Sequence, residues 1–548
     1  MDTTTSNSIV SPSSTTLQLC SIIPENPLAA MELPLLPSFL SLKRHCLSNS
    51  SAPGEFFLAS CPSIVLHLLT TCDLCPRDLA KLEASHRDDD DALSCLVSDF
   101  VLFLRRRVPS LGSLQTSLRT FNSPSQRSQL STFAKRSRRE KSQALAGPGH
   151  SIAVTSKGVV YSFGSNTSGQ LGQGTIEDTW QPRPIRSLSG IRIIQAAIGA
   201  DRTMLISDAG EVYAFGKDCF SQPGLEDQDT KLITTPQRVK SLTEIFVVQA
   251  AIGYHFTAVL SREGRVYTLS WGKDERLGHG SDRNCVLPHP LLGALENIPV
   301  VQIAAGFCYL LALACQPTGM SVYSVGCGLG GKLGHGTQTS EKQPRLIEEF
   351  SVLKMEPVMI SAGTWHAAAV GRDGRVCTWG WGRFGCLGHG TGESELVPKV
   401  VEGLKDVKAV HVATGDYTTF VVSDDGQVYS FGSGEFANLG QVSLSVCSCF
   451  RCLRQWCLYF HLGLFQQGDE DDNTLTPNLV SSLKEIKERV VHVSLTNSIS
   501  WGGHTFAMTE SGTVYAFGTG DRGQLGVELG DNLTERAEPA KVVGIDLS

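Results

Sequence analysis

Apolar and polar positions alternate in short runs along residues 144–548, and glycine-containing turns separate these runs. An alternating run such as HSIAVTS (150–156) precedes a two-residue turn, and a second run such as VVYSFG (159–164) follows it. A period of two residues, bounded by glycine turns, predicts antiparallel strands. A glycine-rich loop and an apolar strand such as VVQIAAG (300–306) complete the unit. Each unit therefore predicts about four short strands.

The run that ends in Val-Tyr-x-Phe-Gly, or in a close variant, occurs seven times. The position after its valine is 161, 213, 267, 323, 377, 429 and 515, so the steps are 52, 54, 56, 54, 52 and 86 residues. A four-stranded sheet with two apolar faces is unstable alone, and radial repetition buries both faces between neighbours. We therefore predict an all-β fold, a seven-bladed β-propeller over residues 144–548, preceded by a small helical segment.

The last step is long because residues 442–467 form an atypical insertion. Removing these 26 residues leaves a step of 60, close to the others. Three hypotheses remain open for the insertion: a retained intron or gene-prediction error, a disordered loop, and a zinc site. The zinc site would use Cys447, Cys449, Cys452, Cys457 and His461.

The first repeat lacks an opening strand segment of the usual kind. The C-terminal run PAKVVGIDLS (539–548) has the character of that segment. We expect the two ends of the repeat array to share one composite blade, which would remove a free sheet edge.

The repeat G-x-x-H-[ST]…V-Y-x-[FW]-G…L-G-x-G resembles that of the regulator of chromosome condensation family, whose members are seven-bladed propellers. Residues 55–110 contain DLCPRDLAKLEAS (73–85) and LSCLVSDFVLFLRR (93–106). They are similar to a short helical, loosely F-box-like segment found ahead of such propellers in some plant members. We predict a disordered Ser/Thr/Pro-rich leader over residues 1–54 and a basic Ser-rich linker over residues 111–143.

The net charge and the cysteine content indicate the cellular compartment of the protein and the class of partner that it binds. The net charge is −7, and residues 147–548 carry 32 Lys and Arg against 41 Asp and Glu. Such a body lacks the basic surplus that binds phosphate backbones, so we expect no direct nucleic-acid binding. The 17 cysteines, with no secretory segment before them, predict reduced intracellular thiols. We expect a nuclear or cytoplasmic protein, or both, without a membrane span.

A basic cluster in the linker has two interpretations. Within KRSRREK (135–141), the charged residues are Lys135, Arg136, Arg138, Arg139, Glu140 and Lys141. The basic ones form a nuclear-import signal or an arm that contacts nucleic acid in one interpretation, and a solvated linker in the other.

Motifs that can indicate cofactor or metal sites recur here with the repeat. The repeat itself therefore explains them, and they do not predict such sites. G-x-G-x-x-G occurs at 326–331, 380–385 and 518–523, each time before Leu-Gly and not before a helix, so no dinucleotide site is expected. His279, His335 and His389 occupy the same slot on different blades, which predicts solvated turn histidines and not a metal site. Cys72 and Cys75 form a lone C-x-x-C, interpreted as thiols with zinc as the alternative. We expect no catalytic residue, cofactor or small-molecule substrate.

The resemblance implies three functions: nucleotide exchange on the small GTPase Ran, binding to chromatin and, in one plant branch, perception of ultraviolet-B light. The plant ultraviolet-B receptor branch has tryptophan directly after the repeat glycine. The matching positions here hold no tryptophan: Pro148, Ala200, Tyr254, Phe307, Thr364, Asp416 and Gly502. Trp365 comes one position later. We therefore expect no neighbouring indoles and no ultraviolet-B photoreception.

The resemblance also places the loops after the repeat glycines on one face. Candidate partner-binding residues there are Asp201, Tyr254, His255, Phe307, Trp365, Asp416 and Tyr417. Aromatic side chains among carboxylates are typical of protein-binding hot spots, although Tyr254 and Phe307 could instead pack between blades. Our leading hypothesis is a non-catalytic protein-interaction scaffold. The alternatives are a guanine-nucleotide exchange factor for a Ran-type small GTPase and a chromatin- or histone-associated regulator.

Overall fold

The computed structural model describes the propeller region with short gaps. The described residues are 142–217, 232–254, 256–270, 276–281, 284–434, 439–440, 473–496, 503–530, 533–545 and 547. The predicted leader, the F-box-like segment, residues 135–141 and the insertion 442–467 lie outside them. So do both cysteine motifs, at 72–75 and 447–461.

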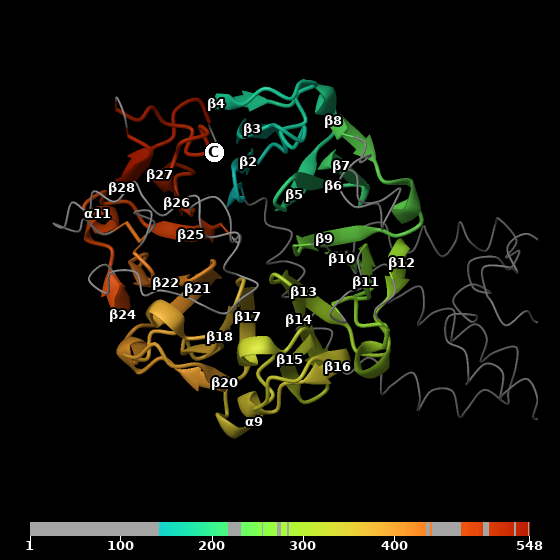
Figure 1. The fold of residues 1–548 in the computed structure, drawn as a ribbon, viewed down its shortest axis with the longest axis vertical. Helices are drawn as coiled ribbons and strands as arrows, with labels where there is room; N and C mark the ends of the chain where they lie inside the picture. Colours follow the sequence, from blue (N-terminus) through green and yellow to red (C-terminus); the bar gives the residue numbers. More distant parts are fainter. Residues whose placement is uncertain are drawn as a thin grey trace, which may run out of the picture. The chain divides into compact units, whose positions relative to one another are not determined.

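Seven four-stranded antiparallel sheets surround a common axis, which confirms the predicted all-β, seven-bladed propeller (Figure 1). We number these sheets as blades one to seven in chain order. In each blade the strands follow one another in sequence order, and the first strand lies nearest the centre of the ring.

The strand bounds are as follows. Blade one has β1 (Gln143–Ala146), β2 (His150–Val154), β3 (Val160–Gly164) and β4 (Thr179–Pro184), and blade two has β5 (Ile193–Ile198), β6 (Arg202–Ser207), β7 (Val212–Lys217) and β8 (Leu232–Arg238). Blade three has β9 (Val247–Ile252), β10 (Phe256–Ser261), β11 (Val266–Ser270) and β12 (Cys285–Pro290), and blade four has β13 (Val300–Ala305), β14 (Tyr309–Gln316), β15 (Gly319–Gly326) and β16 (Glu341–Leu346). Blade five has β17 (Pro357–Ala362), β18 (His366–Gly371), β19 (Val376–Gly380) and β20 (Glu395–Val400). Blade six has β21 (Ala409–Thr414), β22 (Thr418–Ser423), β23 (Val428–Gly432) and β24 (Thr474–Leu479), and blade seven has β25 (Val490–Leu495), β26 (His504–Thr509), β27 (Val514–Thr519) and β28 (Glu535–Lys541).

The described helices are single turns in the connections. They are η3 (Arg186–Leu188), η4 (Lys240–Leu242), η6 (Gly293–Leu295), η7 (Leu329–Gly331), α9 (Glu349–Val352), η8 (Arg383–Gly385), η9 (Glu402–Leu404) and α11 (Ser481–Lys484). Within the described ranges, none of them has the length and hydropathy that a membrane-crossing helix needs.

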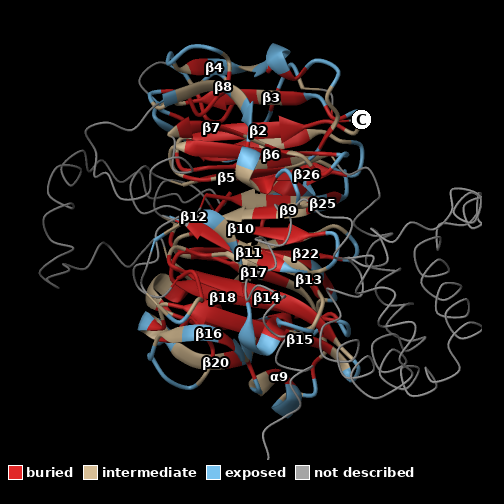
Figure 2. Ribbon diagram, turned by 90° about the vertical axis from the view of Figure 1, so that its right-hand side faces the viewer, coloured by how far each residue is buried: buried red, intermediate tan, exposed pale blue. Residues whose placement is uncertain are grey.

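The apolar core lies between the blades. The buried side chains form seven clusters, and each cluster draws its members from two neighbouring sheets. Between blades six and seven, for example, Phe420 and Val428 pack with Val493 and Phe517. Figure 2 shows buried residues on strands throughout the stack, while outer strands such as β8 and β20 and the turns are more exposed. Because each large side chain contributes about 1.5–3 kcal/mol when buried, a blade without its neighbours loses its core on both sides.

The expected composite blade is wrong. The first blade takes its inner strand from its own sequence, as β1, and β28 is the outer strand of blade seven. The ring closes through packing and hydrogen bonds: Ala146 N donates to Ser494 Oγ at 3.1 Å, and Val542 and Leu547 join the apolar cluster between blades seven and one. The two ends meet side by side because the C-terminal run continues as a blade connection and not as a strand of blade one.

Buried hydrogen-bonded triples between blades, which we call clamps, explain why the G-x-x-H-[ST] phrase of the repeat contains a histidine and a hydroxyl residue. Between blades five and six, His366 Nε2 donates to Thr419 Oγ1 at 2.7 Å, and Thr419 Oγ1 donates to the Cys386 carbonyl at 2.8 Å. The same triple forms twice more, as His150–Thr203–Gln170 and His504–Ser151–Gln524. Each triple joins two blades, so the histidine and the hydroxyl residue are interface groups.

Glutamines of the inner strands also link blades. Gln302 Nε2 donates to the Ile360 carbonyl at 3.0 Å, while its Oε1 accepts from Ile360 N at 3.1 Å. Gln249 bonds Ile303 in the same way. These side chains satisfy backbone groups at the centre of the ring, where no neighbouring strand pairs with them.

Repeat glycines are needed because the inner loops approach each other closely. A Cβ atom on Gly306 would lie 2.5 Å from the Gly363 carbonyl oxygen and 2.0 Å from the Tyr309 ring. We expect Gly306→Ala to lower the free energy of unfolding by about 3 kcal/mol, as overpacking does. Chemical denaturation measures this loss.

A matched control separates crowding from backbone conformation. Gly190 has a φ of 85° but no heavy atom within 4 Å of an added Cβ. Gly190→Ala should therefore cost only about 1 kcal/mol of backbone strain. Equal losses for both variants would contradict the role of close approach at Gly306.

Candidate functional site

The loops that open with a repeat glycine lie at one end of the strands and bond to each other. Tyr254 N in the β9–β10 loop donates to the Phe307 carbonyl at 3.0 Å. Thr364 N in the β17–β18 loop donates to the Gly415 carbonyl at 3.2 Å. Side chains that follow the glycines in blades three to six are therefore brought next to one another.

Aromatic rings form a continuous row across these loops. The Tyr254 and Phe307 rings stack with centroids 4.3 Å apart and planes at 19°, and Phe307 and Trp365 lie 6.1 Å apart at 20°. Trp381, just after β19, meets Trp365 edge-on at 5.0 Å and 89°. Such stacked and perpendicular pairs are favourable beyond the area they bury.

A second aromatic pair continues the row into blade six. Phe384 packs edge-on against Tyr417 with centroids 5.1 Å apart, and the Arg383 guanidinium lies 4.8 Å from the Phe384 ring centre. Burial raises the pKa of the Tyr417 hydroxyl. Phe384 has a φ of 61°, a left-handed conformation that is costly for a bulky residue and is characteristic of functional positions.

We name these six side chains the aromatic face: Tyr254, Phe307, Trp365, Trp381, Phe384 and Tyr417. Its members differ in exposure, because Tyr254 is 42% exposed whereas Trp365 is only 6% exposed. Leu329, 55% exposed, adjoins the face, since the next residue, Gly330, lies against Trp381. Trp365 is thus the buried part of the face, and Tyr254 and Leu329 form its exposed apolar margin.

Among the described residues, the aromatic face lies on blades three to six. At the positions that match Tyr254, Trp365 and Trp381, the described residues of blades one, two and seven are of other types: Pro148, Gly149, Ser165, Ala200, Asp201, Lys217, Gly503 and Thr519. The propeller repeat alone therefore does not require aromatic residues at these positions.

A buried lysine lies beneath the face. Lys332 is fully buried, and its Nζ lies 5.0 Å from the Trp365 ring centre and 5.8 Å from the Tyr309 ring centre. No oxygen or nitrogen atom of the described residues accepts a hydrogen bond from Nζ. Cation–π attraction, which strengthens away from water, holds the ammonium under the indole.

The predicted site residues divide into four groups. Tyr254, Phe307, Trp365 and Tyr417 come together as members of the face. Asp416 lies at the edge of the face, where its carboxylate accepts a hydrogen bond from Thr364 Oγ1.

Asp201 lies apart from this group. It belongs to blade two, where its carbonyl accepts from Lys217 N at 2.9 Å. His255 lies outside the described residues. Whether these residues contact a partner stays a prediction.

The sequence analysis missed Trp381 and Phe384 as members of the face, because they follow a different glycine, the one that ends β19.

The expectation of no neighbouring indoles is wrong. The β18–β19 ladder pairs His366 with Gly380, so the residues just beyond that pair, Trp365 and Trp381, face each other. Matching only the position directly after the repeat glycine could not reveal a cross-strand pair. The absence of ultraviolet-B photoreception stays a prediction.

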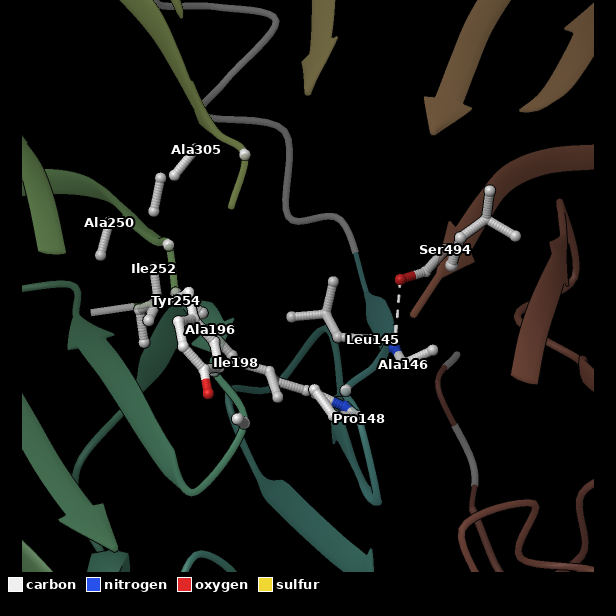
Figure 3. A pocket seen from close by; sticks show the side chains of 18 of the residues that line it. Leu145, Ala146, Pro148, Ala196, Ile198, Ala250, Ile252, Tyr254, Ala305 and Ser494 are labelled. Carbon is white, nitrogen blue, oxygen red and sulfur yellow. Dashed lines mark hydrogen bonds between the residues drawn. The ribbon is translucent and has the colours of Figure 1, made fainter. Parts of the chain in front are cut away.

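A small cavity lies at the centre of the ring, on the same side as Tyr254 and Phe307 (Figure 3). Its volume is about 200 Å³, and alanines of the inner strands line much of it, including Ala196, Ala250 and Ala305. None of the described residues that line it is Asp, Glu, Lys, Arg or His.

The three turn histidines do not converge on one point. Each bonds a hydroxyl of its own blade: His279 to Thr268 at 2.8 Å, His335 to Ser324 at 2.8 Å and His389 to Thr378 at 3.1 Å. They are half-buried, in contrast to the predicted solvated turn, and burial lowers the pKa of His335 to about 4. Among the described residues, no three His, Cys, Asp or Glu side chains gather as a metal site.

Comparison with known proteins identifies the family. The family model described as the RCC1-like domain matches residues 110–454. The ultraviolet-B receptor UVR8 of Arabidopsis thaliana is 31% identical over 386 residues, which span 70% of this chain and 78% of that protein. This chain belongs to the RCC1-like family.

Other relatives of this RCC1-like protein differ in length and title. The human E3 ubiquitin-protein ligase HERC2 is 28% identical over 378 residues, and the match covers 68% of this chain but 7% of HERC2. The structure of Prp20p from Saccharomyces cerevisiae, studied for binding to Gsp1p and histones, matches with a TM-score of 0.55. That match is 18% identical and covers 74% of this chain and 88% of that chain, so it shows the shared fold.

Proposed function

We propose that this RCC1-like protein is a non-catalytic interaction scaffold that binds a protein partner through the aromatic face. One observation carries the proposal: a row of four contacting aromatic side chains and a second contacting aromatic pair occupy one end of blades three to six, while blades one, two and seven hold none at the corresponding described positions. Aromatic anchors in a rigid setting are the groups that dominate protein-binding energy.

The exposed margin supplies the contact area for this binding. Tyr254 and Leu329 reach solvent, and Tyr254 stacks on Phe307, which in turn stacks on the buried Trp365. Aromatic enrichment at an interface core, with charged groups at its rim, is the usual anatomy of such surfaces. Arg383 and Asp416 form such a rim beside the face, which suits a partner segment with apolar side chains and both charge signs.

Site-specific photo-crosslinking in the full-length protein tests this proposal. A photoreactive side chain at position 254 or 329 should crosslink to a partner, which mass spectrometry then identifies. Val352 is the matched control, because it is 71% exposed but lies in α9, between β16 and β17, at the other end of the strands. Crosslinks of equal yield from position 352 would contradict the aromatic face as the docking surface.

The identified partner then allows a quantitative test. Leu329→Asp places a charge in the apolar margin and should weaken binding at least about tenfold, whereas Val352→Asp should change it little. Isothermal titration measures both. Unchanged affinity in Leu329→Asp would contradict the proposal.

The same protein separates the alternative functions. As a scaffold, it should not accelerate nucleotide release from a panel of small GTPases loaded with fluorescent nucleotide. Accelerated release that Leu329→Asp abolishes would establish the exchange-factor hypothesis instead. Histone peptides among the crosslinked partners would favour the chromatin-associated alternative.

A further inference from the structure

Two cysteines face each other beside the aromatic face. The β14–β15 ladder ends with Tyr309 opposite Gly326, and Cys327 N donates to the Cys308 carbonyl at 3.0 Å. Cys308 and Cys327 are therefore the next opposed pair, and their thiols are in hydrogen-bond contact. Hydrogen-bonded opposed residues have Cα atoms about 5.5 Å apart, which lies within the range that disulfides span.

The two thiols differ in access and in electrostatic surroundings. Cys327 is half-buried, so solvent reaches it, whereas Cys308 is buried. The hydrogen bond that the Cys308 thiol donates to Cys327, together with burial, raises the pKa of Cys308 and keeps this thiol protonated at rest. The Lys332 ammonium lies beside Cys308 and favours the thiolate form of that sulfur when it reacts.

We propose that Cys308 and Cys327 form a reversible disulfide by exchange with a small-molecule disulfide such as oxidised glutathione. The Cys327 thiolate attacks one glutathione sulfur, breaks the glutathione S–S bond and releases one glutathione thiolate. The Cys308 sulfur then gives up its proton and attacks Cys327 Sγ, which releases the second glutathione. One protein disulfide forms as one glutathione disulfide is reduced to two thiols.

Two other described cysteines show why this pair is distinctive. Cys377 Sγ lies 3.2 Å from Met355 Sδ, and Cys386 Sγ donates to the Trp381 carbonyl at 3.1 Å. Both are buried, and burial raises the pKa of Cys377 to about 12. Their partners are a thioether and a backbone carbonyl and not a second thiol, and burial limits the access of glutathione to both sulfurs, so these two cysteines should stay reduced.

The disulfide would join two loops of the candidate site. Cys308 directly follows Phe307, and Cys327 precedes the η7 turn that carries Leu329. Cross-linking these positions limits the relative movement of the stacked rings and the exposed leucine. The pair thus provides redox control next to the docking surface, independently of which partner binds there.

Peptide mapping of the full-length protein tests the proposal. The protein is incubated with defined ratios of oxidised to reduced glutathione, alkylated, digested with pepsin at low pH and analysed by non-reducing mass spectrometry. We expect the peptides that contain Cys308 and Cys327 to be joined, with loss of both free thiols, and the joined species to disappear on reduction. Cys377 and Cys386 should be recovered alkylated.

Variants establish the pairing. Cys308→Ala should abolish the joined species and leave Cys327 as a mixed disulfide with glutathione, while Cys315→Ala on the same strand should leave the joined species unchanged. The proposal fails if oxidation of the wild-type chain leaves Cys327 free or only glutathionylated, or if Cys327 is joined to Cys315.

Discussion

Acidification from pH 7.5 to pH 5 is expected to lower the free energy of unfolding by about 6 kcal/mol, through three buried histidines. Burial lowers the pKa of His150, His366 and His504 to about 3 each. In the unfolded chain these groups have a pKa of about 6.5, so below that pH the unfolded state binds more protons. The stability is therefore complete above pH 6.5 and is lost progressively toward pH 3, by about 2 kcal/mol per histidine at pH 5. Urea unfolding at a series of pH values measures the loss.

A single substitution assigns this pH dependence to the clamps between blades. In His366→Gln, the amide can still donate to Thr419 Oγ1 but cannot titrate. The variant should lose about one third less stability than the wild type between pH 7.5 and pH 5. A wild-type pH profile retained in full by this variant would show that other groups, such as surface carboxylates, cause the acid sensitivity.

Trp379→Ala is expected to lower the free energy of unfolding by about 3–5 kcal/mol. The Trp379 ring is fully buried between blades four and five and packs edge-on against Phe350 at 5.8 Å. Its Nε1 donates to the Lys332 carbonyl at 3.1 Å, so truncation also removes the partner of a buried acceptor. Urea unfolding at neutral pH measures the loss.

Trp381, two positions along the chain, provides the matched control. It is half-buried in the aromatic face, so Trp381→Ala should cost about 1 kcal/mol while weakening partner binding. Equal losses of stability in the two variants would contradict the separation between a core indole and an indole of the docking surface.

Much of the architecture could be predicted because it follows from local patterns. Strand alternation and glycine turns are visible within a few residues, and the recurrence of runs such as VVYSFG counts the blades. The resemblance to a family added the end of the strands at which Tyr254, Phe307 and Trp365 would lie. The composite blade was a wrong prediction because short runs such as QALA (143–146) and PAKVVGIDLS (539–548) do not reveal which sheet they join.

Local sequence patterns are enough to predict the number of blades, their strands and the loops that carry the aromatic residues, because each of these depends on neighbours along the chain. The folded arrangement was needed to show that Trp365 meets Trp381, that Cys308 opposes Cys327, that Lys332 lies beneath an indole and that the repeat histidines are buried. These relations join residues on different strands or different blades. They depend on ladder register and on close packing between sheets, which no local pattern specifies.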